Sequence, residues 1–191
     1  MDRRSLETAA AKYSYLRGLL FIPGGLLAIV AALGNAAVAP FRHDWVFVLA
    51  VALLGGAALL INRFYNENYG RLTLSSHQQA RATIIVVVAI AFMVGGSMLL
   101  HALDLPLNPI AVPFAIVMLI SYAVGVGLTA HHVIIWGALL VAGALPVWTG
   151  EDPSNSGLWL SGIAVIVCGI FDHRLFVRTF GPPELPAHAR V

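Results

Sequence analysis

Residues 83–103 read TIIVVVAIAFMVGGSMLLHAL, an apolar run that contains no Asp, Glu, Lys or Arg. A helix needs about 20 apolar residues to cross a hydrocarbon layer about 30 Å thick. This run has that length and composition, so we expect it to form a transmembrane helix. Five further apolar stretches lie along the chain, and the short segments between them carry nearly all of its charge.

The composition agrees with six membrane-spanning segments. Hydrophobic residues make up 59% of the 191 residues and charged residues 10%, whereas a soluble domain spends about a quarter of its residues on charged side chains. We therefore predict an all-α, polytopic integral membrane protein, a single domain that forms a bundle of six transmembrane helices in three hairpins. The predicted helices cover residues 18–39, 45–69, 77–103, 109–128, 133–147 and 158–177.

The distribution of Lys and Arg predicts the orientation, because short cytoplasmic loops are rich in these residues. The first loop has only Arg42, and the loops around Asp104 and around Glu151 have none. The other side would hold the remaining basic residues, so both termini are expected in the cytoplasm (N-in/C-in). These residues are Arg3, Arg4, Lys12, Arg17, Arg63, Arg71, Arg81, Arg174, Arg178 and Arg190.

The composition also favours a bacterial cytoplasmic (inner) membrane, because Arg far outnumbers Lys and because Ala, Gly, Val and Leu dominate, as in GC-rich genomes. One alternative concerns the first helix, since Ala37-Val38-Ala39 has the small-x-small form of a signal-peptide cleavage site. The apolar run before it is longer than the about 7–15 residues of a signal peptide. Pro40 would also follow the cut directly, so we expect the helix to be retained.

The loop between the second and third helices is the best-defined polar feature. Residues 64–72 read FYNENYGRL, and the second helix is expected to continue through this run as far as a glycine cap. Its aromatic rings would lie at headgroup depth. The run resembles an aromatic-rich segment of uncharacterised bacterial multipass inner-membrane proteins, which implies a membrane location and no activity. The residues expected in this cytoplasmic loop are Arg63, Tyr65, Tyr69, Gly70 and Arg71.

Pairs of glycines mark the first three apolar segments. Small residues let helix backbones approach closely in lipid, so we expect these pairs to form helix contacts. The pairs in LLGGAAL (53–59) and MVGGSML (93–99) are predicted to face each other across neighbouring antiparallel helices. A second interpretation makes them flexible points in a transport cycle. The expected packing residues are Gly24, Gly25, Gly55, Gly56, Gly95 and Gly96.

Histidine and aspartate supply the candidate polar sites. His101 and Asp104 are three residues apart at the outer end of the third helix, hence on one helix face. They could share a proton, help to hold a metal, or face headgroups and water. His131–His132 lie in the turn between the fourth and fifth helices, and Asp172–His173 close the sixth helix on the same side. These two groups could therefore meet.

A metal site needs three or four converging ligands, and no fourth ligand is evident beside these groups. Cys168, the single cysteine, is expected to be a buried structural thiol. Asp172 is expected to pair with Arg174 or Arg178. The sequence therefore predicts a chain without a bound metal or other cofactor.

Motifs of six-helix membrane enzymes are missing, among them Gly-x-Ser-Gly of intramembrane serine proteases and H-E-x-x-H of zinc proteases. We expect a non-catalytic integral membrane component (subunit, sensor or scaffold) that acts in the lipid bilayer through partner chains. The partner would be another copy of the chain or a different membrane protein. The alternatives are an oligomeric permease for a small or apolar solute and, third, a lipid-modifying enzyme that uses the inner-side histidines. The net charge of +2, spread over separate loops, argues against nucleic acid.

Overall fold

The computed structural model describes residues 13, 16–70, 76–125, 127–145 and 153–181, and of residues 76–78, 81 and 82 it describes the backbone only. Within these ranges the fold is all-helical and has no strand. A short 3-10 turn, η1, leads into six α-helices, one over each predicted segment. Their bounds are η1 Gly18–Phe21, α2 Ile22–Asn35, α3 Asp44–Tyr69, α4 Ser76–Ala102, α5 Ala111–Gly125, α6 Ala130–Ala144 and α7 Pro153–Phe180.

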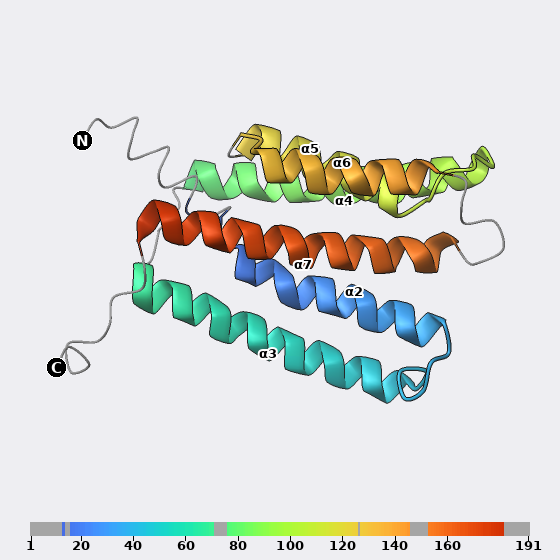
Figure 1. Ribbon diagram of the computed structural model, residues 1–191, viewed down its shortest axis with the longest axis horizontal. Helices are drawn as coiled ribbons and strands as arrows, with labels where there is room; N and C mark the ends of the chain where they lie inside the picture. The colour runs from blue at the N-terminus through green and yellow to red at the C-terminus, as the bar shows by residue number, and fades with distance from the viewer. Residues whose placement is uncertain (1–12, 14–15, 71–75, 126, 146–152, 182–191) are drawn as a thin grey trace.

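Consecutive helices run in opposite directions along roughly parallel axes (Figure 1). Helices α3, α5 and α7 finish at the same end of the bundle, where α4 and α6 begin. We call this the Phe180 end, after the last residue of α7. Helix α7 lies in the middle, because it packs against η1 and α2 on one side and against α5 and α6 on the other. Helix α3 packs on α2, and α4 packs on α5.

Among the described residues, four helices are long and apolar enough to cross a membrane. Helices α5 and α6 have 15 residues each, or about 22 Å of helix, so they are shorter than a bilayer core. Helix α2 ends at Asn35 rather than at residue 39, and a turn follows in which Ala37 has a φ of 54°. The four long spans are Gly18–Asn35, Asp44–Tyr69, Thr83–Ala102 and Pro153–Phe180.

Caps explain several helix boundaries. Oδ1 of Asn108 accepts hydrogen bonds from the backbone N–H groups of Ile110 (3.1 Å) and Ala111 (2.9 Å), so α5 begins there. Helix α7 begins at Pro153, five residues before its predicted start, because proline fits the first turn of a helix. Gly70 follows α3 at its C-terminal cap with a φ of 86°, a backbone conformation that favours glycine.

Glycines bring α7 and the η1–α2 segment into backbone contact. A Cβ atom added to Gly25 would lie 2.7 Å from the carbonyl oxygen of Gly162, and one added to Gly169 would lie 2.5 Å from the carbonyl oxygen of Gly18. The two contact points are seven residues apart along each segment, about two helix turns. Close backbone packing of this kind is how small residues hold helices together in lipid. Gly25 thus packs against the backbone of α7.

The predicted contact between the other two glycine pairs is not found within the chain. Gly96 instead packs against Pro113 of α5, whose side chain would lie 3.2 Å from an added Cβ. The reason is the helix order, since α3 lies against α2 and α4 against α5. Small residues permit a close approach without selecting the partner helix. A Cβ atom would meet nothing within 4 Å at Gly24, Gly55, Gly56 and Gly95.

Candidate functional site

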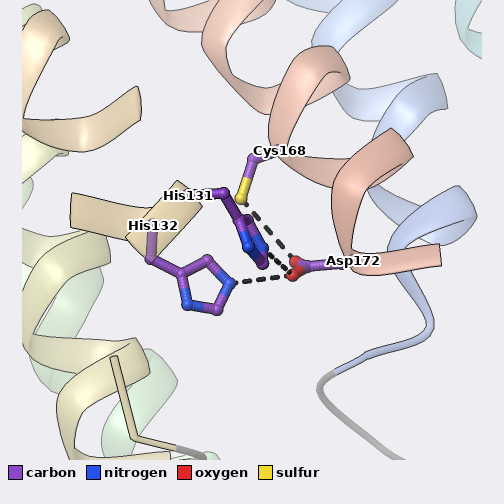
Figure 2. A group of neighbouring side chains, drawn as sticks. All are labelled: His131, His132, Cys168 and Asp172. Atoms are coloured by element: carbon purple, nitrogen blue, oxygen red, sulfur yellow. Dashed lines mark hydrogen bonds and ion pairs between the residues drawn. The ribbon is translucent and has the colours of Figure 1, made fainter. Parts of the chain in front are cut away.

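Two adjacent histidines at the start of α6 are held by the residue that caps this helix. Thr129 has the extended backbone of an N-cap residue (φ −100°, ψ 164°), and its N–H donates to Nδ1 of His132 at 3.3 Å. Oγ1 of Thr129 lies 2.9 Å from Nδ1 of His131 and 3.0 Å from Nδ1 of His132. Both rings are therefore anchored through Nδ1, and both Nε2 atoms approach α7 (Figure 2).

The carboxylate of Asp172 in α7 contacts both imidazoles. Its buried carboxylate places Oδ1 2.9 Å from Nε2 of His131 and 2.8 Å from Nε2 of His132. The hydroxyl of Tyr122 in α5 donates to Oδ2 at 2.6 Å. Because Nδ1 of His132 accepts a hydrogen bond from Thr129, its Nε2 carries the proton and donates to the carboxylate. Three helices thus meet at one carboxylate.

Cys168 lies one helix turn before Asp172 on α7. Its Sγ is 3.7 Å from Oδ2 of Asp172 and 3.5 Å from the hydroxyl oxygen of Tyr122. One potential ligand atom from each of His131, His132, Cys168 and Asp172 lies within 4.8 Å of the others, and we call these four residues the His–Cys–Asp cluster (Figure 2). Imidazole, thiolate and carboxylate are the groups that bind zinc and similar transition metals.

Aromatic rings enclose this cluster. The Tyr122 ring stacks on His132 with centroids 3.8 Å apart, and the Phe171 ring stacks on His131 at 5.7 Å. The side chains of His132 and Asp172 have no exposed surface, whereas that of His131 is 18% exposed. His131 is therefore the member of the cluster closest to the surroundings of the bundle.

The predicted pairing of Asp172 with Arg174 or Arg178 is wrong. Among the described residues the ion-pair partners of Asp172 are the two imidazoles, and Arg174 lies over the Phe171 ring, 5.9 Å from its centroid. Helix geometry gives the reason, because residues three or four positions apart are neighbours on a helix surface and residues two or six apart are not. Within the described part of the chain, this buried carboxylate therefore has no Arg or Lys partner.

His173 belongs to a second polar cluster, on the side of α7 that faces η1 and α3. Its Nδ1 lies 2.8 Å from the hydroxyl oxygen of Tyr65. Tyr65 is fully buried against Phe176, so it is a packing residue between helices rather than a ring that faces headgroups. Arg17 lies over the Tyr65 ring and donates to Oδ1 of Asn66 at 2.6 Å. Neighbouring residues of α7 thus enter two different clusters.

The remaining predicted polar residues lie apart from the His–Cys–Asp cluster. His101 and Asp104 are exposed at the end of α4, where the Asp104 N–H donates to the backbone oxygen of His101 at 3.2 Å. Arg63 forms an exposed ion pair with the residue one turn further along α3, at 2.5 Å. Tyr69 packs in the second cluster, and Arg71 lies outside the described residues.

Three residues of the site, Tyr122, Thr129 and Cys168, are not recognised from the sequence as site residues. The four-residue spacing between Cys168 and Asp172 is a readable signal, because it places both side chains on one helix face. The position of Thr129 before two histidines is a weaker signal, since threonine caps many helices. Comparison with family models, with curated proteins and with solved structures finds no match for this chain.

Proposed function

We propose that this chain is a six-helix integral membrane protein of the bacterial cytoplasmic membrane with both termini in the cytoplasm. Four helices have the length and composition for crossing, and the alternating directions of all six suit three hairpins (Figure 1). Helices α5 and α6 would cross with local thinning of the bilayer or with flanking residues that reach the interface. The Phe180 end would be cytoplasmic, because Arg17, Arg63 and Arg174 lie toward it.

Cysteine labelling tests this topology. With Cys168 replaced by serine, the single-cysteine variants Ser75→Cys and Ser154→Cys are exposed to a membrane-impermeant reagent in intact cells and in inside-out vesicles. We expect the two positions to label from opposite sides of the membrane. Labelling of both from the same side would exclude six crossings.

For the role of the chain we propose a non-catalytic sensor or subunit that acts through contact with a partner chain. The observation that carries this proposal is a contrast in burial: no residue in the apolar windows of α3 and α4 is buried, against 39% for α7. Lipid can cover apolar side chains, but a glycine inside a helix costs about 1 kcal/mol relative to alanine. The open glycines Gly55, Gly56 and Gly95 therefore favour a further helix against α3 and α4.

Helix α7 supports the sensor role because it links the His–Cys–Asp cluster to α3, one of the two helices that carry the open glycines. Asp172 contacts α5 and α6, and the next residue, His173, hydrogen-bonds Tyr65 of α3. A change at the cluster therefore has a direct route to α3. The route consists of packed side chains on one helix.

Burial disfavours the lipid-modifying enzyme. A group that reacts with a lipid must be reached by that lipid, yet His132 and Asp172 have no exposed surface. A closed cluster of this kind suits a role in holding helices or in responding to a small bound species better than it suits turnover.

Assembly in lipid tests the partner contact. The wild-type chain and the Gly55→Leu variant are extracted directly into lipid nanodiscs, and the mass and composition of the particles are measured. We expect the wild type to carry a second copy or another membrane protein and Gly55→Leu to lose it, because the added side chain fills the contact face. Ala138→Leu, at an exposed position of α6, is the matched control and should keep the wild-type mass. Monomeric wild-type particles would refute the proposal.

A further inference from the structure

We propose that the His–Cys–Asp cluster is a binding site for a divalent transition metal of the zinc class. The ligand atoms are Nε2 of His131, Nε2 of His132, Sγ of Cys168 and one carboxylate oxygen of Asp172. The sequence predicts no metal because a fourth ligand is not evident, and Cys168 supplies that ligand. The idea that this metal is the signal of a sensor rests on the proposed function. Metal binding itself does not depend on that function.

The spacing of the four donor atoms suits a small tetrahedral ion. Zinc bonds of about 2.0–2.1 Å to nitrogen or oxygen and about 2.3 Å to sulfur place neighbouring ligand atoms about 3.3–3.6 Å apart. Here Sγ lies 3.7 Å from Oδ2 of Asp172, and both Nε2 atoms lie 2.8–2.9 Å from Oδ1. With every pair inside 4.8 Å, side-chain shifts of about 1 Å or less bring all four donors to bonding distance of one ion.

Groups around the ligands are placed as the outer shell of a metal site requires. A ligating histidine normally donates its other ring N–H to an oxygen, and a ligating carboxylate is normally hydrogen-bonded. Oγ1 of Thr129 lies within 3.0 Å of both Nδ1 atoms, so it can accept from either ring beside the His132 backbone N–H that it caps. The Tyr122 hydroxyl donates to Oδ2 of Asp172 and leaves Oδ1 for the ion.

Metal binding changes the protonation of both rings in a defined way. Each Nε2 binds the ion through its lone pair. A proton on Nε2 leaves to water, and the neutral ring carries its one proton on Nδ1, taken from water, beside Oγ1 of Thr129. His132 then loses its longer contact of 3.3 Å with the Thr129 N–H. The Cys168 S–H bond breaks, its proton leaves to water, and a metal–sulfur bond forms without any change in oxidation state.

The charge of the site also favours a divalent cation. A buried carboxylate is costly unless a positive charge compensates it, and the ion-pair partners of Asp172 in the described residues are imidazoles alone. A divalent ion with one carboxylate, one thiolate and two neutral imidazoles gives a site of zero net charge. Sulfur and nitrogen donors select zinc-class ions over magnesium and calcium, which prefer oxygen.

The decisive experiment measures metal in the full-length protein purified without an affinity tag. The chain in detergent is saturated with Zn²⁺, dialysed, and analysed for metal and protein content. We expect about one zinc per chain in the wild type and in His101→Ala, which removes an exposed histidine outside the cluster. Cys168→Ser and Asp172→Asn should each weaken binding by more than the about 10–100-fold that follows loss of an outer-shell partner.

Cobalt gives a second readout that needs no variant. Co²⁺ bound to the wild type should show a thiolate-to-cobalt charge-transfer band, because Cys168 is the single cysteine, together with the intense visible bands of tetrahedral cobalt. Folded wild-type protein that retains no zinc would overturn the proposal. So would a cobalt spectrum without the thiolate band, or a loss of zinc in His101→Ala as large as in Cys168→Ser.

The outcome is independent of the partner test. A monomeric protein that binds one zinc would retain the metal site and refute the partner contact. An assembled protein that binds no zinc would retain the partner contact and refute the metal site.

Discussion

Helices α7 and α4 are nearly equal in length, with 28 and 27 residues, yet they occupy opposite situations in the bundle. Helix α7 buries nine residues against neighbours on two sides, whereas none of the apolar window of α4 is buried. The buried set of α7 includes Gly162, Gly169, Cys168 and Asp172. Small and polar residues, rather than apolar ones, therefore distinguish the central helix from the peripheral one.

For a chain in the proposed bilayer, the physical reason is the solvent. In water an apolar face gains free energy by leaving the solvent, so hydrophobic periodicity identifies the buried side of a helix. Lipid tails are as apolar as leucine, and association then depends on close packing and on hydrogen bonds between helices. The predictions below test this contrast between the α7 interior and the α3–α4 periphery, beginning with the largest expected effect.

The strongest test introduces the same side chain at two glycines. Gly25→Leu forces a side chain into the backbone of α7, where even a Cβ would lie 2.7 Å from the Gly162 oxygen. Overpacking costs about 1–3 kcal/mol or more, and rigid backbone on both sides favours the upper end. Gly55→Leu meets open space within the chain and should leave its folding intact. Thermal unfolding of each variant as a monomer in detergent measures the difference, and equal melting temperatures would contradict it.

A smaller loss is expected when one hydrogen bond is removed from the interior. Tyr122→Phe deletes the O–H donor at 2.6 Å from Oδ2 of Asp172, and hydrogen bonds to charged groups are worth about 1.5–3 kcal/mol. Tyr69→Phe is the matched control, because the buried Tyr69 hydroxyl finds no hydrogen-bond partner among the described residues. Its loss should be neutral or slightly stabilising. If chemical denaturation gives equal changes for both variants, the Asp172 network does not stabilise the interior.

Thr129→Val separates stability from metal binding. Loss of the capping hydroxyl should lower the free energy of unfolding by about 1 kcal/mol. Because valine has no oxygen to accept from an Nδ1–H group, zinc affinity should fall by about 10–100-fold. Thr129→Ser restores the hydroxyl and should recover both. Competition with a zinc chelator measures the affinity, and equal affinities in valine and serine variants would show that Thr129 does not orient the rings.

The smallest effect is expected at the surface of α3. Arg63→Ala removes an exposed ion pair, and exposed pairs in water contribute little because the solvent screens them. The melting temperature should not change measurably. Arg17→Ala, which removes the hydrogen bonds to Asn62 and Asn66, should lower it. A larger loss for Arg63→Ala would place that residue in the structural interior.

The sequence predicts the positions of the helices better than it predicts which helices pack together. Six apolar segments are recognisable and a helix lies over each of them, and four of these helices among the described residues have the length that a bilayer requires. Which helices touch depends on shape, and the similar runs LLGGAAL and MVGGSML therefore suggest a contact that the chain does not make. The backbone contacts between η1–α2 and α7 involve glycines scattered singly along α7.

The sequence predicts only part of the candidate site. The predicted orientation places His131–His132 and Asp172 on one side of the membrane, which raises the possibility of a meeting. Their convergence depends on the rotation of α6 and α7 about their axes, and periodicity cannot supply this for helices with weak amphipathicity. Cys168 is overlooked because a lone cysteine in an apolar run usually packs like any small apolar residue.

Asp172 and His173 contact different helices and thereby fix the rotation of α7 about its own axis. Consecutive residues on an α-helix diverge by about 100°, so these two side chains point to α5–α6 and to α3 respectively. A rotation of α7 in either direction would pull at least one of them from its partners. The hydrogen bonds on the two sides of α7 therefore act together against rotation of this helix about its own axis.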